Sequence, residues 1–313
     1  MSTLPRMNRR DFAKCLGSGL LGCLIAPRMT RANTPREVAI TMDDFGLGAD
    51  AGLAEQRTRA ILSAFRAHSI RSAIFVTGKN VDSDLGQRLL KLWNDDGHMI
   101  CNHTYSHHDY ASSLLAEYTA DVLRCEALIK NHKQFRKLFR FPYLNEGTTA
   151  EQRDRMRVWL TDHGYRNGAV TIDASDWYID ERLQKRLDIK RDADTSGYRN
   201  YYLQHILDRS NYYEDLAVRT IGRRIKHTLL IHHNTLNALY LGDILDQYTR
   251  LGWTLIDAEE AYTDPLFKLQ PSTLPAGDSL VLALAIQKGK IQNSRNPPED
   301  GVYEAPRMDR LGL

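Results

Sequence analysis

The sequence VAITMDDFGLG, residues 38–48, joins a run of strand-forming residues to two adjacent acidic residues. The apolar and β-branched residues 38–42 predict a buried strand, and the two glycines that follow the acids predict that the strand ends there. Asp43 and Asp44 carry like charges at the end of an apolar strand, so they repel one another unless a positive group lies beside them. The stretch therefore predicts a strand that presents two carboxylates to a positive partner.

Short β-branched runs alternate with longer helical stretches from residue 37 onward, and this alternation indicates an α/β fold with parallel strands. The predicted strands are Val38–Met42, Ser72–Thr77, Met99–Asn102, Leu138–Phe141, Asn167–Ile172, Thr228–Ile231 and Trp253–Ile256. The predicted helices are Gly52–Ala67, Asp84–Asn94, Ser113–His132, Thr149–His163 and Leu236–Leu251. Gly97, Gly164 and Gly252 fall just past three of these helices, where a left-handed cap favours glycine. Such a set of parallel strands predicts a barrel, or an open sheet curled most of the way round.

Two stretches interrupt the alternation. Residues 178–227 are charged and rich in tyrosine, and they predict a helical insertion before the sixth strand. Residues 264–313 carry several prolines around one short apolar helix, predicted at 278–287. We expect this tail to pack on a barrel domain that spans 33–263, rather than to form a domain of its own.

Residues 1–32 are typical of a bacterial export signal. Arg9 and Arg10 precede a short run of small and apolar residues, and a pair of arginines indicates the twin-arginine route. The sequence LLGC, which ends at Cys23, also resembles a lipoprotein box, so a lipid anchor at this cysteine is the alternative to cleavage near residue 32. The apolar run is too short to span a bilayer, and we expect no transmembrane segment in the mature chain. These features predict export to the periplasm or cell envelope.

The remainder of the chain has a balanced charge. The signal segment holds six basic residues and one acidic residue, and without it 36 basic and 38 acidic side chains remain, a net charge of −2. No Lys/Arg stripe is present in the sequence, so nothing in it indicates nucleic-acid binding. Cys101 and Cys125 lie in apolar contexts, which favours two buried thiols over a disulfide.

Polar clusters follow the ends of several predicted strands. In α/β barrels the functional residues lie at the carboxyl ends of the strands, so these clusters are expected on one rim. The clusters are DD at 43–44, NHTYSHHDY at 102–110, RFPY at 140–143, DASDW at 173–177 and LIHHN at 230–234. We therefore expect them to form a single site.

The spacing of two histidines indicates a metal site. His103 and His107 are four residues apart, so one helical turn would place both imidazoles on one face. Two neutral imidazoles and one carboxylate form a suitable ligand set for a divalent ion, above all Zn²⁺, with a further position left for water. The predicted positive partner is thus a metal ion bound by one of the two aspartates, and the other aspartate is free to act as a base.

Taken in order, the motifs TMDD, HTYSH, RFPY, DASDW and LIH resemble the five motifs of the polysaccharide deacetylases, the NodB-like carbohydrate esterases of family four. The resemblance spans residues 37 to about 263 and implies a distorted seven-stranded (β/α) barrel. It also implies an enzyme that removes N- or O-linked acetyl groups from glycans. By this resemblance, Asp43 is the base and Arg140 orients it, while Asp44 binds the metal with His103 and His107. His232 is the acid and Asp176 orients it. The Tyr143 backbone N–H stabilises the oxyanion, and Trp177 and Leu230 line the acetyl pocket.

These roles suit the chemistry of amide hydrolysis. A metal-bound water becomes nucleophilic near neutral pH, and the metal polarises the acyl oxygen. His232 must be protonated to release an amine, and a neighbouring carboxylate such as Asp176 raises the imidazole pKa toward that state. Together with these roles, the resemblance implies a metal-dependent hydrolase of carbon–nitrogen bonds other than peptide bonds, which acts on an acetylated glycan or oligosaccharide.

Three alternatives remain open. The same fold serves deformylases and ureide-type amidases on small molecules, and a narrow pocket closed by the insertion would favour them. Two histidines and a carboxylate also form the ligand triad of non-haem iron oxygenases, but that function leaves Asp43 and Arg140 without a role. The third alternative is a non-catalytic carbohydrate-binding protein, which the presence of every motif residue disfavours.

The insertion predicts something about substrate size. Because its ends join strands that carry motif residues, we expect 178–227 to lie over or beside the pocket and to favour short oligosaccharides over polymer. Its tyrosines, Tyr201, Tyr202, Tyr212 and Tyr213, are expected either to contact sugar rings or to pack within the helices.

Overall fold

The computed structural model describes residues 34–46, 51–292 and 301–313. The chain divides into two units, Met1–Thr34 and Pro35–Leu313, and only the second is described below. The predicted export signal and Cys23 lie outside the described residues. Among the described helices, none combines the length and the apolar character that crossing a bilayer requires.

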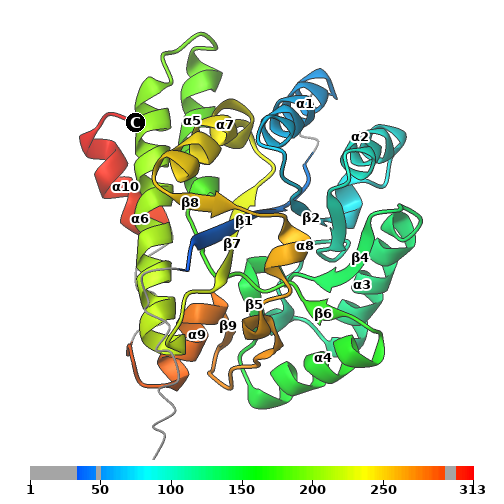
Figure 1. Ribbon diagram of the computed structural model, residues 1–313. Coiled ribbons are helices and arrows are strands. Elements are labelled where there is room, and N and C mark those ends of the chain that lie inside the picture. The colour runs from blue at the N-terminus through cyan, green and yellow to red at the C-terminus, as the bar shows by residue number, and fades with distance from the viewer. Residues whose placement is uncertain (1–33, 47–50, 293–300) are drawn as a thin grey trace, which may run out of the picture. The chain divides into compact units, whose positions relative to one another are not determined.

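One seven-stranded, parallel sheet forms the centre of the second unit (Figure 1). The strand order is β6-β4-β3-β2-β1-β7, and β8 pairs with the start of β1. These strands are β1 (Arg36–Asp43), β2 (Ala73–Val76), β3 (Met99–Asn102), β4 (Phe135–Phe139), β6 (Arg166–Asn167), β7 (Lys226–His232) and β8 (Trp253–Leu255). Strand β1 is central and apolar, and its last residue, Asp43, is in register with Phe75 and His232. The predicted α/β fold with parallel strands is confirmed.

Helices connect the strands and cover the sheet (Figure 1). They are α1 (Ala51–Ala67), α2 (Asp84–Asp95), α3 (Leu115–Ile129), α4 (Ala150–Asp162), α7 (Thr235–Arg250) and the short α8 (Ala258–Ala261). Their ends follow local chemistry, since the Thr149 hydroxyl accepts a hydrogen bond from the Gln152 N–H and caps α4. The predicted left-handed glycines are also observed, with φ of 84° at Gly97, 73° at Gly164 and 75° at Gly252.

Residues 166–172 join the two edges of the sheet. The Gly168 N–H donates to the Phe139 carbonyl of β4 at 2.7 Å, and the Ile172 N–H donates to Thr228 of β7 at 3.0 Å. The fifth predicted strand, Asn167–Ile172, is therefore regular only at its start, where two residues form β6, and it reaches β7 through an isolated bridge. The result is a distorted barrel that few hydrogen bonds close.

The predicted insertion forms two helices, α5 (Asp176–Ile189) and α6 (Ser196–Ile221). Helix α6 runs along the flank of the sheet and packs against α7 and α9 (Figure 1). Tyr202 and Tyr213 are fully buried, Tyr212 packs on the same core, and the Tyr201 hydroxyl donates to Glu304. Of the two alternatives expected for these tyrosines, packing within the helices is confirmed, because Tyr202 and Tyr213 are buried in the core and Tyr201 and Tyr212 pack against it.

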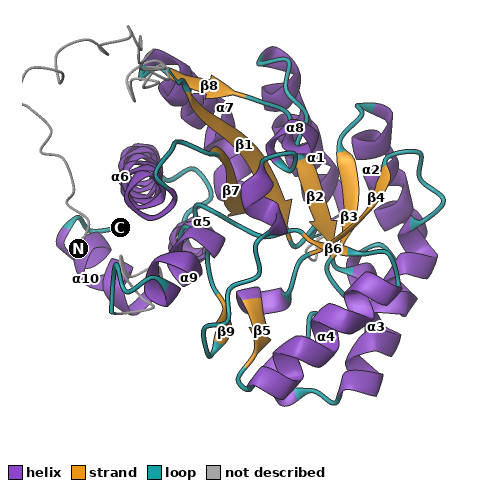
Figure 2. Cartoon of the chain, turned by 60° about the horizontal axis from the view of Figure 1, so that its bottom comes forward, coloured by secondary structure: helices purple, strands orange, loops and turns teal. Residues whose placement is uncertain are grey.

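The C-terminal extension contributes a strand and two helices. Strand β9 (Ala276–Gly277) pairs antiparallel with β5 (Asn145–Gly147), as Figure 2 shows. Helix α9 (Leu280–Gln287) is apolar around most of its surface and packs against α6, which is why it lies in the core. Helix α10 (Gly301–Arg310) lies against α5. In the part of the chain that the structure describes, four short 3₁₀ helices complete the elements: η1 (Gly78–Asn80), η2 (Tyr110–Ser112), η3 (Pro142–Leu144) and η4 (Pro265–Lys268).

Two cysteines belong to the described part of the chain. Cys101 and Cys125 are both buried and unbridged, as the apolar contexts predicted. Burial raises the pKa of the Cys125 thiol to about 12, so this side chain acts as a small apolar group at neutral pH.

Candidate functional site

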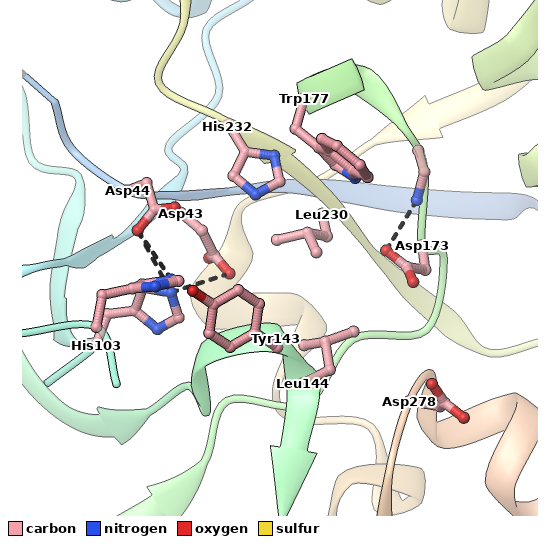
Figure 3. A pocket seen from close by; sticks show the side chains of 12 residues that line it. Asp43, Asp44, His103, Tyr143, Leu144, Asp173, Trp177, Leu230, His232 and Asp278 are labelled. Atoms are coloured by element: carbon pink, nitrogen blue, oxygen red, sulfur yellow. Dashed lines mark hydrogen bonds and ion pairs between the residues drawn. The ribbon is translucent and has the colours of Figure 1, made fainter. Parts of the chain in front are cut away.

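A pocket of about 510 Å³ opens where β1, β3 and β7 end (Figure 3). Eight of the ten side chains predicted for the site line it. The other two, Arg140 and Asp176, lie behind the wall and bind Asp43 and His232 respectively. The lining residues are Asp43, Asp44, His103, His107, Tyr143, Leu144, Asp173, Ala174, Trp177, Leu230, His232 and Asp278. None of the residues 178–227 is among them, so the insertion does not cover this pocket.

Asp44, His103 and His107 form the candidate metal site. The three residues each offer one ligand atom, and these atoms lie within 4.8 Å of one another. Asp44 Oδ1 lies 3.3 Å from His107 Nε2 and 3.7 Å from His103 Nε2. Ligands about 2.1 Å from a tetrahedral ion are separated by roughly 3.4 Å, so the observed spacing fits a Zn²⁺-sized ion.

The two histidines meet through a loop, so the predicted helical turn is wrong. Thr104 and His107 both have left-handed backbones, with φ of 63° and 60°. The Thr104 hydroxyl accepts a hydrogen bond from the His107 N–H at 2.9 Å, and its carbonyl accepts one from Gly78. This compact loop places the two imidazole rings 4.9 Å apart, centre to centre.

Hydrogen bonds and burial prepare both imidazoles as ligands. His103 Nδ1 lies 2.8 Å from the Arg140 carbonyl, which can only accept, so Nδ1 donates and Nε2, which faces Asp44, is the nitrogen placed to bind a metal ion. Burial and the neighbouring His103 lower the pKa of His107 to about 4, so this ring is neutral at physiological pH. Burial alone would raise the pKa of Asp44, but His103, His107 and the Thr77 hydroxyl lower it overall. Two neutral imidazoles and an ionised carboxylate are the forms that bind a divalent ion.

A buried arginine holds the second carboxylate. Arg140 Nη1 lies 3.0 and 3.1 Å from the two oxygens of Asp43, and both side chains are almost fully buried. Burial alone would lower the pKa of Arg140, but Asp43 and other partners raise it above its ordinary value. The guanidinium therefore stays charged and holds the Asp43 carboxylate in a fixed orientation.

The remaining donors of Arg140 are also bound. Its Nη2 donates to the Thr41 hydroxyl and to the Tyr262 hydroxyl, both at 3.2 Å, and its Nε donates to the Gly168 carbonyl. The guanidinium carbon lies 4.1 Å from the centre of the Phe75 ring. Satisfied donors and a flat apolar contact allow a charged group to be buried and fixed in place.

A second buried carboxylate, Asp176, holds an imidazole, that of His232, at another wall of the pocket. His232 Nδ1 donates to Asp176 Oδ1 at 2.8 Å, and Asp176 is fully buried. Its other oxygen accepts from the His232 N–H at 2.8 Å, from Asn237 at 2.9 Å and from Asn234 at 3.1 Å. Burial alone would lower the pKa of His232, but Asp176 raises it to about 10. The ring is therefore a cation at neutral pH, and it lines the pocket.

The neighbouring histidine has a different environment. His233 is buried outside the pocket, where its Nε2 lies 3.2 Å from the Thr58 hydroxyl and its Nδ1 accepts from the Gly46 N–H at 3.4 Å. Burial lowers the pKa of His233 to about 3, so this ring is neutral. Adjacent residues at the end of a strand point to opposite faces, which explains the contrast with His232.

Four residues of the site, Asn237, Tyr262, Leu144 and Asp278, had no recognisable sequence signal. Asn237 and Tyr262 support Asp176 and Arg140 from the interior, and each lies on a helix or at its end, where such residues are common. Leu144 and Asp278 line the pocket from the turn after β4 and from the C-terminal extension. Asp173 also lines the pocket, and its place in the DASDW cluster was the one available signal.

Comparison with known proteins gives one family. Residues 30–167 match the family model described as polysaccharide deacetylase. A peptidoglycan-N-acetylglucosamine deacetylase of Bacillus cereus is 28% identical over 142 residues, which make up 45% of this chain and 46% of that protein. The chain thus aligns with less than half the length of this relative.

Solved structures agree on the fold. The wild-type form of a CE4 family pseudoenzyme from Bacillus anthracis has a TM-score of 0.51 at 15% identity, and the match covers 73% of this chain and 66% of that chain. A mutant of the same pseudoenzyme with restored enzymatic activity has a TM-score of 0.51 at 16% identity, covering 73% and 68%. At such identities the likeness concerns the fold alone.

Proposed function

We propose that the protein is a metal-dependent deacetylase of an N- or O-acetylated glycan, a proposal supported by the match of residues 30–167 to the polysaccharide deacetylase family model. The observation that carries the proposal is the joint presence of three elements in one pocket. These are the ligand set of Asp44, His103 and His107, a carboxylate held by Arg140, and an imidazole held by Asp176. Together they supply a base and an acid on either side of a metal site.

Asp44, His103 and His107 would hold the metal ion, for which Zn²⁺ suits two nitrogen ligands and one oxygen ligand. When bound, the ion would polarise the acyl oxygen and lower the pKa of a water in the pocket. The chain's own residues then move the protons and position the substrate.

Asp43 is the proposed base. Its Oδ2 lies 3.8 Å from His103 Nε2, so the carboxylate is adjacent to the ligand set without being needed as a ligand. Arg140 contacts both of its oxygens and fixes the carboxylate, and further lone pairs remain to accept a proton from the attacking water.

His232 is the proposed acid. Its Nδ1 proton is committed to Asp176, so the proton on Nε2 is the one available to the leaving group. An amine leaves only when its nitrogen is protonated, and an imidazolium held by a carboxylate can supply that proton at neutral pH.

The other lining residues would bind the acetyl group. We propose that the Tyr143 N–H donates to the developing oxyanion, since its left-handed backbone, with φ of 56°, lies at the edge of the pocket. Leu230 is nearly buried and Trp177 is partly exposed, and these apolar side chains suit the acetyl methyl group.

The substrate proposed is an acetylated glycan of the cell envelope, reached by export through the signal predicted at 1–32. The Bacillus cereus relative is named for peptidoglycan N-acetylglucosamine, which supports this class. The alternative of a small-molecule amidase required a pocket closed by the insertion. It loses that support because α5 and α6 pack beside the sheet and only Trp177, at the start of α5, lines the pocket.

Acetate release from acetylated chitin, peptidoglycan and xylan fragments tests the function. We expect release that stops after chelation and returns when Zn²⁺ is added. Metal-independent release would contradict the role given to Asp44, His103 and His107. Metal binding without release from any fragment would favour the non-catalytic or the amidase alternative.

A further inference from the structure

Five of the residues that line the pocket have left-handed backbones although none of them is glycine. Two of them are consecutive, Tyr143 with φ of 56° and Leu144 with φ of 52°. Side chains with a Cβ rarely adopt this conformation, because the Cβ crowds the next carbonyl oxygen. Two such residues in succession persist only where the surrounding structure fixes them.

The contacts within the turn do not fix it by themselves. The Leu144 N–H donates to the Phe141 carbonyl at 3.0 Å, and the Asn145 N–H donates to the Pro142 carbonyl. Ordinary tight turns also make such bonds. Tyr143 is 68% exposed, and its ring lies 4.8 Å from the His107 ring, edge to face. The hold must come from another part of the chain.

That part is the C-terminal extension. Strand β9 lies beside β5, which follows the turn (Figure 2). In their register Gly277 is opposite Asn145 and Ala276 is opposite Gly147. The Asp278 N–H then donates to the Leu144 carbonyl at 3.1 Å. Figure 3 shows Tyr143, Leu144 and Asp278 along one side of the pocket. The extension therefore binds the backbone of the turn directly.

The closeness of this contact explains a glycine. Gly277 has a φ of 129°, and a Cβ added there would lie 1.9 Å from the Leu144 carbonyl oxygen. No side chain fits at that distance, so only glycine allows β9 to approach the turn. A side chain at residue 277 would therefore force the Leu144 carbonyl group to move.

The other side of β9 is anchored to the barrel. The Ser279 hydroxyl donates to the Thr171 carbonyl at 2.9 Å, and the Leu280 N–H donates to the Val170 carbonyl at 2.7 Å. Both acceptors belong to residues 166–172, which join β4 to β7. Helix α9 follows at once and is buried in the core. The extension is thus fixed on one side and holds the turn on the other.

We propose that Gly277 and Asp278 are positioning residues, which hold Tyr143 and Leu144 in the left-handed conformation that places the Tyr143 N–H at the pocket. The inference rests on the proposed deacetylase function, because that function gives the Tyr143 N–H its role. It extends that function to a segment outside residues 30–167, which match the family. Gly277 and Asp278 act here through the backbone of the turn.

Gly277→Ala is the test variant, and Gly289→Ala is its matched control. Gly289 lies in the same extension with φ of 64°, and a Cβ there meets nothing within 4 Å. Both substitutions place alanine at positive φ, but only the first displaces the Leu144 carbonyl. Two measurements are made on the Zn²⁺-loaded proteins: kcat and KM for acetate release, and hydrogen exchange of peptides that cover 141–147.

We expect Gly277→Ala to lower kcat at least tenfold with unchanged metal content, and to speed hydrogen exchange at 143–147. Gly289→Ala should stay within twofold of wild type in both measurements. Faster exchange with an unchanged kcat would overturn the positioning role. Unchanged exchange would show that the extension does not hold the turn.

A second variant, and a rule for the case in which the wild type is inactive, complete the test. Ser279→Ala removes only the hydroxyl that anchors β9, so it should fold even if Gly277→Ala does not, and it should lower kcat severalfold with faster exchange at 143–147. If the wild-type protein releases acetate from no glycan, the proposed function fails. The exchange comparison then decides alone whether the extension holds the turn, with faster exchange supporting the hold and unchanged exchange refuting it.

Discussion

Asp176→Asn should convert His232 from a cation into a neutral ring. The lost carboxylate has one oxygen that accepts from His232 Nδ1 and a second that accepts from three N–H donors. The single oxygen of asparagine satisfies the three donors, which turns its NH₂ group toward Nδ1. Nδ1 must then accept a hydrogen bond, so the ring becomes neutral and its Nε2–H becomes a far weaker acid.

The size of the effect follows from the pKa of His232. The pKa is raised to about 10 against an ordinary value of 6.5, because Asp176, with smaller contributions from Asp44 and Asp43, outweighs the lowering by burial. Without the Asp176 carboxylate we expect the pKa to return to the ordinary value or below it. At pH 8 the protonated fraction should fall from nearly all of the protein to roughly 3% or less, about a thirtyfold loss of the active form. A bound divalent cation would lower the pKa in both proteins, so the difference between the two profiles is the quantity to compare.

The assay is the pH dependence of kcat/KM for acetate release, with metal content measured on the same samples. Activity requires protonated His232, so it should fall as the pH rises through the folded pKa. In Asp176→Asn this alkaline limb should lie at least one unit lower. Metal content should not change, because Asp176 is not in the ligand set. An alkaline limb at the same pH in both proteins would refute the role of His232 as the acid.

Three further predictions follow from single contacts. His103→Ala and His107→Ala should each lose most of the bound metal in elemental analysis. His108 is an exposed neighbour of these ligands, so His108→Ala should retain the metal. Equal metal content in all three variants would contradict the ligand set. His233→Ala should lower the free energy of unfolding by about 1–3 kcal/mol, because it leaves the Thr58 hydroxyl and the Gly46 N–H without this partner, yet keep kcat within a few fold. A larger loss of kcat than in His232→Ala would reverse the two histidines. Tyr262→Phe removes one hydrogen-bond acceptor of Arg140, an interaction worth roughly 1 kcal/mol. It should lower kcat by about 2–10-fold without changing the metal content. An unchanged kcat would show that Thr41 and Gly168 suffice to hold the guanidinium.

The sequence predicted the fold class and the convergence of the polar clusters for one physical reason. Parallel strands end at the same rim, so residues that directly follow them meet, as Asp43 does with His232 in the register of β1 and β7. The left-handed glycines after three helices were predicted on equally local grounds. Local rules were sufficient where the strand ends themselves determine the geometry.

Other features depend on contacts that are distant in the sequence. The loop at 103–107 is not helical, because Gly78 and the Thr104 hydroxyl stabilise two left-handed residues in it. Asp278 reaches the pocket only because β9 pairs with β5. In the sequence, the tyrosines of the insertion are equally compatible with a sugar-binding surface and with a packed helix. Only the burial of one face of α6 in the structure shows that they pack.

The most direct test of the account is acetate release by Asp43→Asn at equal Zn²⁺ content to wild type, measured on an N-acetylglucosamine oligomer. Asp43 is the proposed base and is held by Arg140 beside the ligand set, so the variant keeps the metal site but cannot take the proton of the attacking water. The account predicts a loss of at least about 100-fold in kcat with unchanged metal content. Acetate release at the wild-type rate by the Zn²⁺-loaded variant would contradict it.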